Sequence, residues 1–462
     1  MEGVFSLRIT ISNKILLHGL PEASERELTG RLTFQNPKWL ENDRMGRWNG
    51  DTPETLTCYE CTRDGLIIPR GFTRQLLLLC KRHGVRYHLE DRRRTLAAVE
   101  FTFKGKLRPF QNEAVRAVLS RDFGVLSSPT GSGKTVMALY VIAERRQPAL
   151  VIVHTKELLY QWRDRAVTFL DLQEDEIGLV GDGKKTIGPR LTIGIVNSIY
   201  KIANEIREHV GFLLTDECHR CPSRTFMEAV TAFDSLYMLG LSATPWRRDK
   251  LSRLIYWHLG DLVHEVKKEA LLETGDILPV EVVTRETDFR TWRDASEEYS
   301  TVLSELTEDP ERNALIAADV AREARNGGGI CLVLSDRKAH CEALRGLLRG
   351  KGIECELLTG DVGNGERQAI IDRLNKGEIK ILIATNQLLG EGFDCPGLST
   401  LFLTTPVRFS GRVIQVVGRI LRSAPGKDKA RVYDYVDTEM PVLVASAKAR
   451  GRVFRSIKGV AS

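Results

Sequence analysis

The sequence predicts an α/β fold in which two parallel-sheet lobes follow one another and a small α+β domain precedes them. From Leu107 onward, short apolar runs rich in β-branched residues alternate with longer helical stretches, as in a parallel sheet covered on both faces. The same alternation restarts after Thr244, which predicts the second lobe. The residues before Leu107 instead alternate apolar with polar positions and carry turn signals, which predicts the α+β domain.

The candidate strands of the first lobe are FGVLSS from Phe123, ALVIVH from Ala149, LTIGIVN from Leu191, FLLTDE from Phe212 and LYMLGLSAT from Leu236. Those of the second lobe are LPVEVV from Leu278, GICLVLS from Gly329, ECELLTG from Glu354, KILIAT from Lys380 and TLFLTT from Thr400. Between the first two of these, a polar helix-forming stretch from Trp292 to Arg325 breaks at Pro310. Gly, Asp and Pro interrupt both periodicities near 275–279. The expected domains are therefore 1–105, 106–276 and 277–445, with a basic tail over 446–462.

The leading domain is expected to contain strands at FSLRITIS from Phe5, RLTFQN from Arg31, TLTCYEC from Thr55 and AAVEFTF from Ala97, and a helix at RQLLLLCKRH from Arg74. A glycine-rich loop from Arg44 to Gly50 and a tight turn at Asp64 should separate these elements.

The composition is that of a soluble globular protein, with 42% hydrophobic and 28% charged residues. No apolar run is long enough to span a bilayer, and the start from Met1 to Leu20 has no cleavable small-residue site, so we expect a cytoplasmic protein. The net charge is +6, but the first 106 residues carry 18 basic and 13 acidic side chains, and the tail adds five basic residues and no acid. The basic residues near the two ends of the chain could bind phosphate groups. The alternative is that they form an ordinary solvated surface.

The sequence contains nine cysteines, which is an odd number, and it shows no secretion signal. A disulfide framework is therefore not expected. The spacing of Cys58, Cys61, Cys80 and His83 resembles that of a structural zinc site. In a regular strand, however, Cys58 and Cys61 would point to opposite faces, and Cys80 falls on the apolar side of a helix. We therefore expect no zinc at these residues.

A phosphate-binding loop is predicted where SPTGSGKT follows an apolar strand and opens a helix. Its residues are Ser128, Pro129, Thr130, Gly131, Ser132, Gly133, Lys134 and Thr135. The loop amides and the helix N-terminus can surround a β-phosphate, Lys134 can reach the β- and γ-phosphates, and Thr135 can ligate Mg²⁺.

A pair of carboxylates supports this prediction. The strand in LLTDECH ends in Asp216 and Glu217, at the sheet edge where the phosphate loop also lies. A magnesium-binding carboxylate and a water-orienting carboxylate belong there. Solvated acidic pairs at strand ends are common, but this pair shares its lobe with a phosphate loop.

The ordered series of motifs resembles the superfamily 2 helicases, close to their XPB-like, RecG-like and phage UvsW-like group. LRPFQNEAV, with Arg108 and Gln111, is similar to the adenine-recognising element of that group. VHTKELLYQW and TIGIVNS are similar to the first-lobe segments that hold the nucleic-acid backbone, and SAT is similar to the coupling motif. LVLSDR, ATNQLLGEGFDCP and QVVGRILR resemble the remaining motifs, in the second lobe.

The resemblance assigns further site residues. The residues implied in contacts to the nucleic-acid backbone are Thr155, Lys156, Asn197, Ser198, Ser335, Asp336, Thr385 and Asn386. The residues implied in coupling are Ser242, Ala243 and Thr244. The element that links nucleotide to nucleic acid contains Glu391, Gly392 and Asp394, of which Gly392 and Asp394 are implied in binding ATP. Gln415, Arg419 and Arg422 are implied at catalysis. The two arginines are three apart on a helix, so they face one side and could stabilise the γ-phosphate charge when the lobes close. XPB-like proteins have an Arg-Glu-Asp triplet after the coupling motif, where this chain has Arg247-Arg248-Asp249, so any function of that Glu is in doubt.

The resemblance implies two RecA-like lobes, ATP and Mg²⁺ as cofactors, and DNA as partner. The leading hypothesis is a DNA-dependent ATPase that translocates on duplex or branched DNA and remodels forks or junctions. The alternatives are a restriction or defence motor, an RNA helicase, and a scaffold with an inactive motor.

The leading domain is predicted to recognise the substrate. Its segments FQNPKW, RMGRW and IIPRGF are similar to leading segments of phage branch-migration helicases, and basic residues interleave there with Trp39, Trp48 and Phe72. Arg92, Arg93 and Arg94 are its candidate DNA contacts, with a solvated linker as the alternative.

Overall fold

The computed structural model describes residues 7–220, 223–243, 251–295, 297–326, 329–385, 395, 397–406, 417–418, 420–421, 427 and 429–458. By their contacts the residues form two compact units, one of 1–129 with 133–266 and one of 130–132 with 267–462. The first unit contains the N-terminal domain and the first lobe, and the second unit contains the second lobe. No helix within the described ranges is long and apolar enough to cross a membrane.

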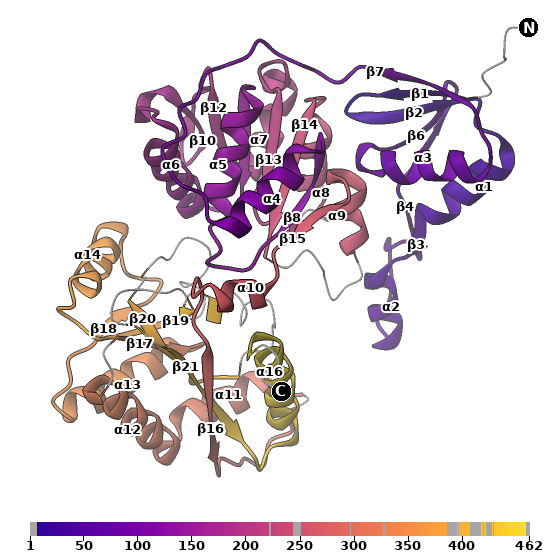
Figure 1. The fold of residues 1–462 in the computed structure, drawn as a ribbon. Coiled ribbons are helices and arrows are strands. Elements are labelled where there is room, and N and C mark those ends of the chain that lie inside the picture. Colours follow the sequence, from indigo (N-terminus) through magenta and orange to yellow (C-terminus); the bar gives the residue numbers. More distant parts are fainter. Residues whose placement is uncertain are drawn as a thin grey trace, which may run out of the picture. The chain divides into compact units, whose positions relative to one another are not determined.

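The N-terminal domain is built on a five-stranded sheet of order β5-β6-β2-β1-β7 (Figure 1). Its strands are β1 (Leu7–Ile11), β2 (Lys14–His18), β5 (Glu60–Thr62), β6 (Gly65–Pro69) and β7 (Tyr87–Asp91), and its helices are α1 (Glu22–Arg31) and α3 (Thr73–Arg82). Leu7, Ile9 and Ile11 alternate along β1 and are buried against the helices. This period of two confirms that one face of the sheet carries the core of the domain.

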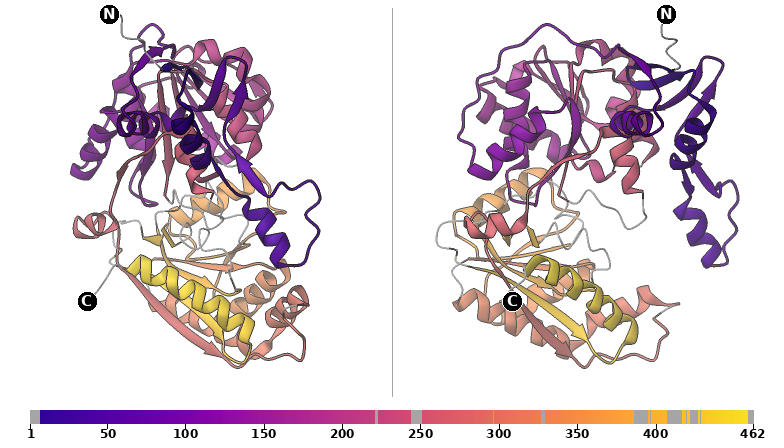
Figure 2. Two further views of the ribbon diagram at one scale, coloured as in Figure 1. Left: turned by 90° about the vertical axis from the view of Figure 1, so that its right-hand side faces the viewer. Right: turned by 45° about the vertical axis from the view of Figure 1, so that its right-hand side comes forward.

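An arm projects from this sheet (Figure 2). It consists of β3 (Thr33–Gln35), β4 (Thr55–Thr57) and α2 (Pro37–Arg44), and β3 and β4 pair antiparallel. Asn36 closes the base of the arm, since its amide donates to the Pro53 carbonyl at 2.9 Å and its side-chain oxygen accepts from Lys38 N at 3.0 Å.

The core of the N-terminal domain continues into the first lobe through α9 (Ser252–Leu259). Trp257 of α9 meets Phe72 edge to face, with ring centroids 6.0 Å apart. The buried Arg70 side chain donates to the Ser235 carbonyl at 2.8 Å. The N-terminal domain and the first lobe are therefore packed as one body.

The first lobe is an eight-stranded sheet of order β11-β10-β12-β9-β13-β14-β8-β15, and all its strand pairs are parallel except that of β11 with β10. The strands are β8 (Phe123–Ser127), β9 (Ala149–Val153), β10 (Ile177–Gly181), β11 (Lys184–Lys185), β12 (Leu191–Ile195), β13 (Phe212–Thr215), β14 (Tyr237–Ser242) and β15 (Leu262–Glu265). The helices besides α9 are α4 (Pro109–Leu119), α5 (Lys134–Arg145), α6 (Lys156–Leu170), α7 (Val196–Ile206) and α8 (Arg224–Thr231). Strands β9 and β13 are buried along their whole length, which explains their unbroken apolar runs.

The second lobe is a six-stranded, wholly parallel sheet of order β16-β21-β20-β17-β19-β18. The strands are β16 (Val280–Thr287), β17 (Ile330–Ser335), β18 (Glu356–Leu358), β19 (Ile381–Thr385), β20 (Leu398–Leu403) and β21 (Ala430–Asp437). The helices are α10 (Lys268–Glu273), α11 (Tyr299–Glu308), α12 (Pro310–Asn326), α13 (Lys338–Gly350), α14 (Asn364–Asn375) and α16 (Pro441–Lys458). Pro310 starts α12, as its sequence position predicts.

The predicted fold class is confirmed, and two local predictions are wrong. AAVEFTF forms no strand, and instead runs as a strap along the first lobe, where Val99 N donates to the Arg146 carbonyl and Lys104 N to the Phe169 carbonyl. The strap finds these backbone partners on the lobe rather than beside a sheet edge. TLTCYEC divides between β4 and β5, which pair with different strands.

The residues with zinc-like spacing differ in their burial and in their contacts. Cys80 is fully buried in the core of the N-terminal domain and Cys61 is exposed. The His83 ring faces Glu27, with Nε2 at 2.6 Å from Oε2. Across the described ranges, no group of three or more His, Cys, Asp or Glu side chains is placed to hold a metal ion.

Candidate active site

The phosphate loop joins β8 to α5, as predicted. Gly131 and Gly133 both have positive φ, at 92° and 81°. A Cβ at Gly133 would lie 2.6 Å from Gln111 Nε2, so the loop requires glycine there. The Lys134 ammonium donates to the Ser128 carbonyl at 3.1 Å and thus lies over the loop. The loop therefore has the backbone shape and the cation that a bound phosphate requires.

Gln111 belongs to the predicted adenine-recognising element. Its side-chain oxygen accepts from Arg108 N at 2.9 Å in a capping box that opens α4. The residue is 95% buried, beside the phosphate loop. Both residues predicted for adenine recognition therefore begin one helix next to the loop.

Asp216 follows β13 and is held from two sides. Its Oδ1 accepts from Glu217 N at 2.9 Å, and its Oδ2 accepts from the indole N–H of Trp162 at 2.8 Å. Asp216 is 7% exposed and Trp162 is 1% exposed. Trp162 lies on α6 two turns after Thr155, and no motif in the sequence points to it.

Glu217 is connected to the coupling motif through His219. His219 Nδ1 lies 3.2 Å from Glu217 Oε2 and 3.3 Å from Ser242 Oγ. This histidine follows the carboxylate pair by two residues, and the motif LLTDECH predicts no role for it. The structure thus places one ring between the predicted water-orienting carboxylate and the end of β14.

The two neighbouring carboxyls have opposite pKa shifts. Burial raises the pKa of Asp216, and the negative charge of Glu217 raises it further. Burial alone would raise the pKa of Glu217 as well, but the His219 hydrogen bond and the charge of Lys134 outweigh burial, so its pKa is lowered. A bound cation would stabilise the charged form of Asp216, so the donor set fits Mg²⁺.

The predicted nucleic-acid contacts of the first lobe lie after the carboxyl ends of β9 and β12. The Thr155 hydroxyl accepts from Leu158 N and caps α6, while the Lys156 ammonium lies 2.7 Å from Asp182 Oδ1. Asn197 is exposed and Ser198 is half-buried at the start of α7. All four predicted residues therefore share one edge of the sheet, the edge that also carries Asp216.

In the second lobe, Ser335 is fully buried, and its hydroxyl lies 3.0 Å from His340 Nδ1. Thr385 is 91% buried at the end of β19. Asp336 is exposed. Of these three predicted contacts, only Asp336 presents its side chain to solvent, and all three assignments stay predictions.

Two of the three arginines in the run after β7 form ion pairs with acidic residues of the first lobe. The Arg93 guanidinium lies 2.9 Å from Asp122 Oδ2, and that of Arg94 lies 2.9 Å from Asp234 Oδ1, both in the first lobe. These ion pairs hold the end of the N-terminal domain on the first lobe. Arg92 is 65% exposed and lies 2.7 Å from Glu90 Oε1 within β7, and like the other two arginines it stays a predicted DNA contact.

Several predicted residues lie outside the described part of the chain. They are Thr244 of the coupling motif, Arg247 to Asp249 behind it, and Asn386, Glu391, Gly392, Asp394, Gln415, Arg419 and Arg422 of the second lobe. Their assigned roles stay predictions.

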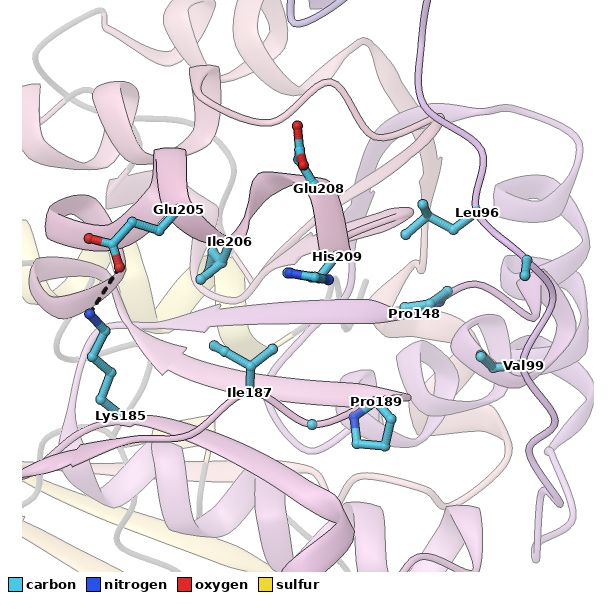
Figure 3. Close-up of a pocket in the computed structure, with 12 residues that line it drawn as sticks. Leu96, Val99, Pro148, Lys185, Ile187, Pro189, Glu205, Ile206, Glu208 and His209 are labelled. Atoms are coloured by element: carbon cyan, nitrogen blue, oxygen red, sulfur yellow. Dashed lines mark hydrogen bonds and ion pairs between the residues drawn. The ribbon is translucent and has the colours of Figure 1, made fainter.

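A hollow of about 700 Å³ lies on the opposite edge of the first lobe (Figure 3). It is lined by residues just before β9, β12 and β13, among them Pro148, Pro189 and His209, and by Leu96 of the strap. The predicted ATP-binding residues lie at the carboxyl ends of the strands, so this hollow is not the nucleotide site.

Two family models match the chain. The type III restriction enzyme res subunit matches residues 104–247, and the helicase conserved C-terminal domain matches 305–424. The DNA 3′–5′ translocase XPB2 of Sulfurisphaera tokodaii is 26% identical over 359 residues, which are 71% of this chain and 80% of the relative.

Two solved structures share the fold. The ATP-dependent type ISP restriction-modification enzyme LlaBIII bound to DNA aligns at a TM-score of 0.58 and 15% identity over 77% of this chain and 30% of its own. Dbp5 of S. cerevisiae bound to RNA aligns at 0.52 and 16% identity over 77% and 88%.

Proposed function

The chain belongs to the superfamily 2 helicases of XPB-like type, and on this premise we propose that it translocates on duplex or branched DNA and remodels forks or junctions. The enzyme is a nucleic-acid-dependent ATPase. The observation that carries the proposal is the cluster of Lys134, Asp216, Glu217 and His219 in one lobe. The DNA assignment is supported by the names of the XPB and Rad25 relatives.

Each residue of the cluster has a separate task in hydrolysis. Lys134 would bind the β- and γ-phosphates, and Thr135 with Asp216 would hold Mg²⁺, which when bound neutralises phosphate charge. Glu217 would orient the attacking water, and its lowered pKa keeps it ionised for that task. His219 would pass a change at Glu217 on to Ser242, 3.3 Å away.

The second lobe would supply further positive charge to the γ-phosphate. We assign Arg419 and Arg422 to the γ-phosphate and Gln415 to its neighbourhood, following the motif QVVGRILR. An arginine finger is worth about three to five decades of rate, so turnover would depend on the second lobe. Hydrolysis could then control lobe motion.

The N-terminal domain would choose the substrate. Its excess of basic residues and its exposed Arg92 support this role. Because its core includes Trp257 of the first lobe, deleting the domain would expose that core. Surface substitutions in the full-length protein therefore test this role better than truncation.

The test is an ATPase assay of the full-length protein with no nucleic acid, single strand, blunt duplex, fork and four-way junction, each as DNA and as RNA. Greater stimulation by DNA forks and junctions than by blunt duplex supports the proposal. Equal stimulation by long unbranched duplex favours a restriction-type motor, and greater stimulation by RNA favours an RNA helicase. No hydrolysis under any condition would make the chain a binding scaffold.

A further inference from the structure

The tip of the arm, Arg44 to Gly50, presents a tryptophan to solvent. Trp48 is 91% exposed, and Met45 beside it is 53% exposed. Two other aromatics that the sequence offers for base stacking differ from it, since Phe72 is 1% exposed and Trp39 is half-buried. Trp48 is therefore the one of the three whose ring is available to a ligand.

The tip is ordered by its own backbone. Arg47 N donates to the Asn42 carbonyl at 2.8 Å, and Thr52 N donates to the Asn49 carbonyl at 2.8 Å. A Cβ at Gly50 would lie only 3.0 Å from the Trp48 ring, so glycine lets the indole lie against the backbone. Because 91% of the Trp48 side chain is exposed, its ring remains open to a flat ligand.

The arm is fixed to the first lobe at its base. The Phe34 ring of β3 meets Trp257 edge to face, with centroids 5.7 Å apart, and the Arg253 guanidinium lies 4.8 Å from the Phe34 centroid. Both partners belong to α9, the first described helix after Ser242 of the coupling motif. Because Phe34 is held by α9, the arm moves with the first lobe.

The charge of the tip indicates the chemistry of its ligand. Arg44 and Arg47 are exposed within the tip, and the acidic Asp43 and Asp51 flank the tip on either side. Guanidinium groups beside an open aromatic ring suit a planar base with phosphates on either side of it. Within a duplex each base pair is covered on both faces by its neighbours, so away from duplex ends the ligand must contain unpaired or opened nucleotides.

We propose that Trp48 stacks on an unpaired DNA base at a fork or junction while Arg44 and Arg47 contact the flanking phosphates. This proposal rests on the proposed DNA-dependent activity, and it assigns branch recognition to a tip that the first lobe carries.

The test compares Trp48→Ala and Trp48→Phe in the full-length protein with Trp292→Ala, a matched control at a fully exposed tryptophan whose neighbour Arg293 is paired with Glu298 and Glu305. The affinities for a single strand, a fork and a blunt duplex of equal length are measured by fluorescence anisotropy, with thermal melting as the folding check. Stacking is worth about 1–3 kcal/mol per base, so Trp48→Ala should bind fork and single strand roughly 5- to 150-fold more weakly. Trp48→Phe should keep most of the affinity, and Trp292→Ala all of it.

Salt dependence tests the arginines separately. Replacing Arg44 and Arg47 together by Ala should reduce the log–log salt slope on single strand by about 1.4, at roughly 0.7 per phosphate. If Trp48→Ala binds the fork as tightly as the parent protein, and the ATPase of the protein responds to DNA, the stacking proposal is wrong while the proposed function stands. The exposed tip would then be a candidate surface for a protein partner. An equal loss on all three DNAs would also overturn the stacking proposal. A parent protein that neither binds nor responds to DNA would instead refute the proposed function.

Discussion

The hydrogen bond from Trp162 to Asp216 predicts that a buried tryptophan on α6 tunes the magnesium-binding carboxylate. Trp162→Phe removes the indole N–H but keeps an aromatic ring in the core. A hydrogen bond to a charged group contributes about 1.5–3 kcal/mol, and each 1.4 kcal/mol is tenfold, so kcat should fall roughly 10- to 150-fold if the bond acts in the transition state. The half-saturating Mg²⁺ concentration should rise as well, because Asp216 Oδ2 loses its only donor among the described residues.

The pH profile separates this role from simple packing. The Trp162 hydrogen bond lowers the pKa of Asp216, so its loss should raise that pKa and move the acid limb of kcat to higher pH. Trp257→Phe, at another buried tryptophan of the first unit, serves as the control and should leave the acid limb in place. DNA-stimulated ATPase is measured against pH and Mg²⁺, with melting curves to confirm folding. If Trp162→Phe melts like the parent and keeps both profiles, Asp216 does not depend on this bond.

Four further substitutions test separate parts of the protein. Lys134→Ala should weaken nucleotide binding, whereas Glu217→Gln should keep binding and stop turnover; near-parental hydrolysis by Glu217→Gln would remove its assigned role. Arg422→Ala should lower kcat by about three to five decades with little change in the affinity for an ATP analogue, and lost analogue binding with preserved turnover would contradict this. Burial lowers the pKa of His258 to about 4, so the folded protein keeps it neutral while the unfolded chain protonates below about 6.5. Unfolding should therefore become easier as pH falls from about 6.5 to 4, by about 3 kcal/mol from this group in all, and His258→Leu should flatten that part of a urea-midpoint curve.

The motor lobes could be predicted because their signals are local. A buried parallel strand is a short apolar run, and Gly131 and Gly133 mark a turn that only glycine forms easily. Asp216 was predictable because it directly follows such a run. Trp162 was not, since a tryptophan on the apolar side of a helix has the same sequence pattern whether it packs or donates to a carboxylate 54 residues away.

The arginine run shows what charge patterning alone leaves open. Arg92, Arg93 and Arg94 form one basic cluster in the sequence, and a cluster of that kind predicts a phosphate-binding surface or a solvated linker. Arg94 instead pairs with Asp234, 140 residues away, and Arg93 with Asp122. Partners that lie so far apart in the sequence cannot be recognised from it. The sequence therefore could not distinguish an arginine in an internal ion pair from one on a DNA-binding surface.

The junction that these ion pairs secure determines how the N-terminal domain can act. Phe34, Phe72 and Trp257 form one aromatic cluster across the domain boundary, and Trp257 belongs to the helix that follows the coupling motif. Movement of the domain relative to the first lobe would break these contacts and expose the buried Trp257, which is unfavourable. The domain therefore follows any displacement of the first lobe during the ATPase cycle. DNA held at Trp48 would then be displaced together with the first lobe, so substrate recognition and force would act through the same compact unit.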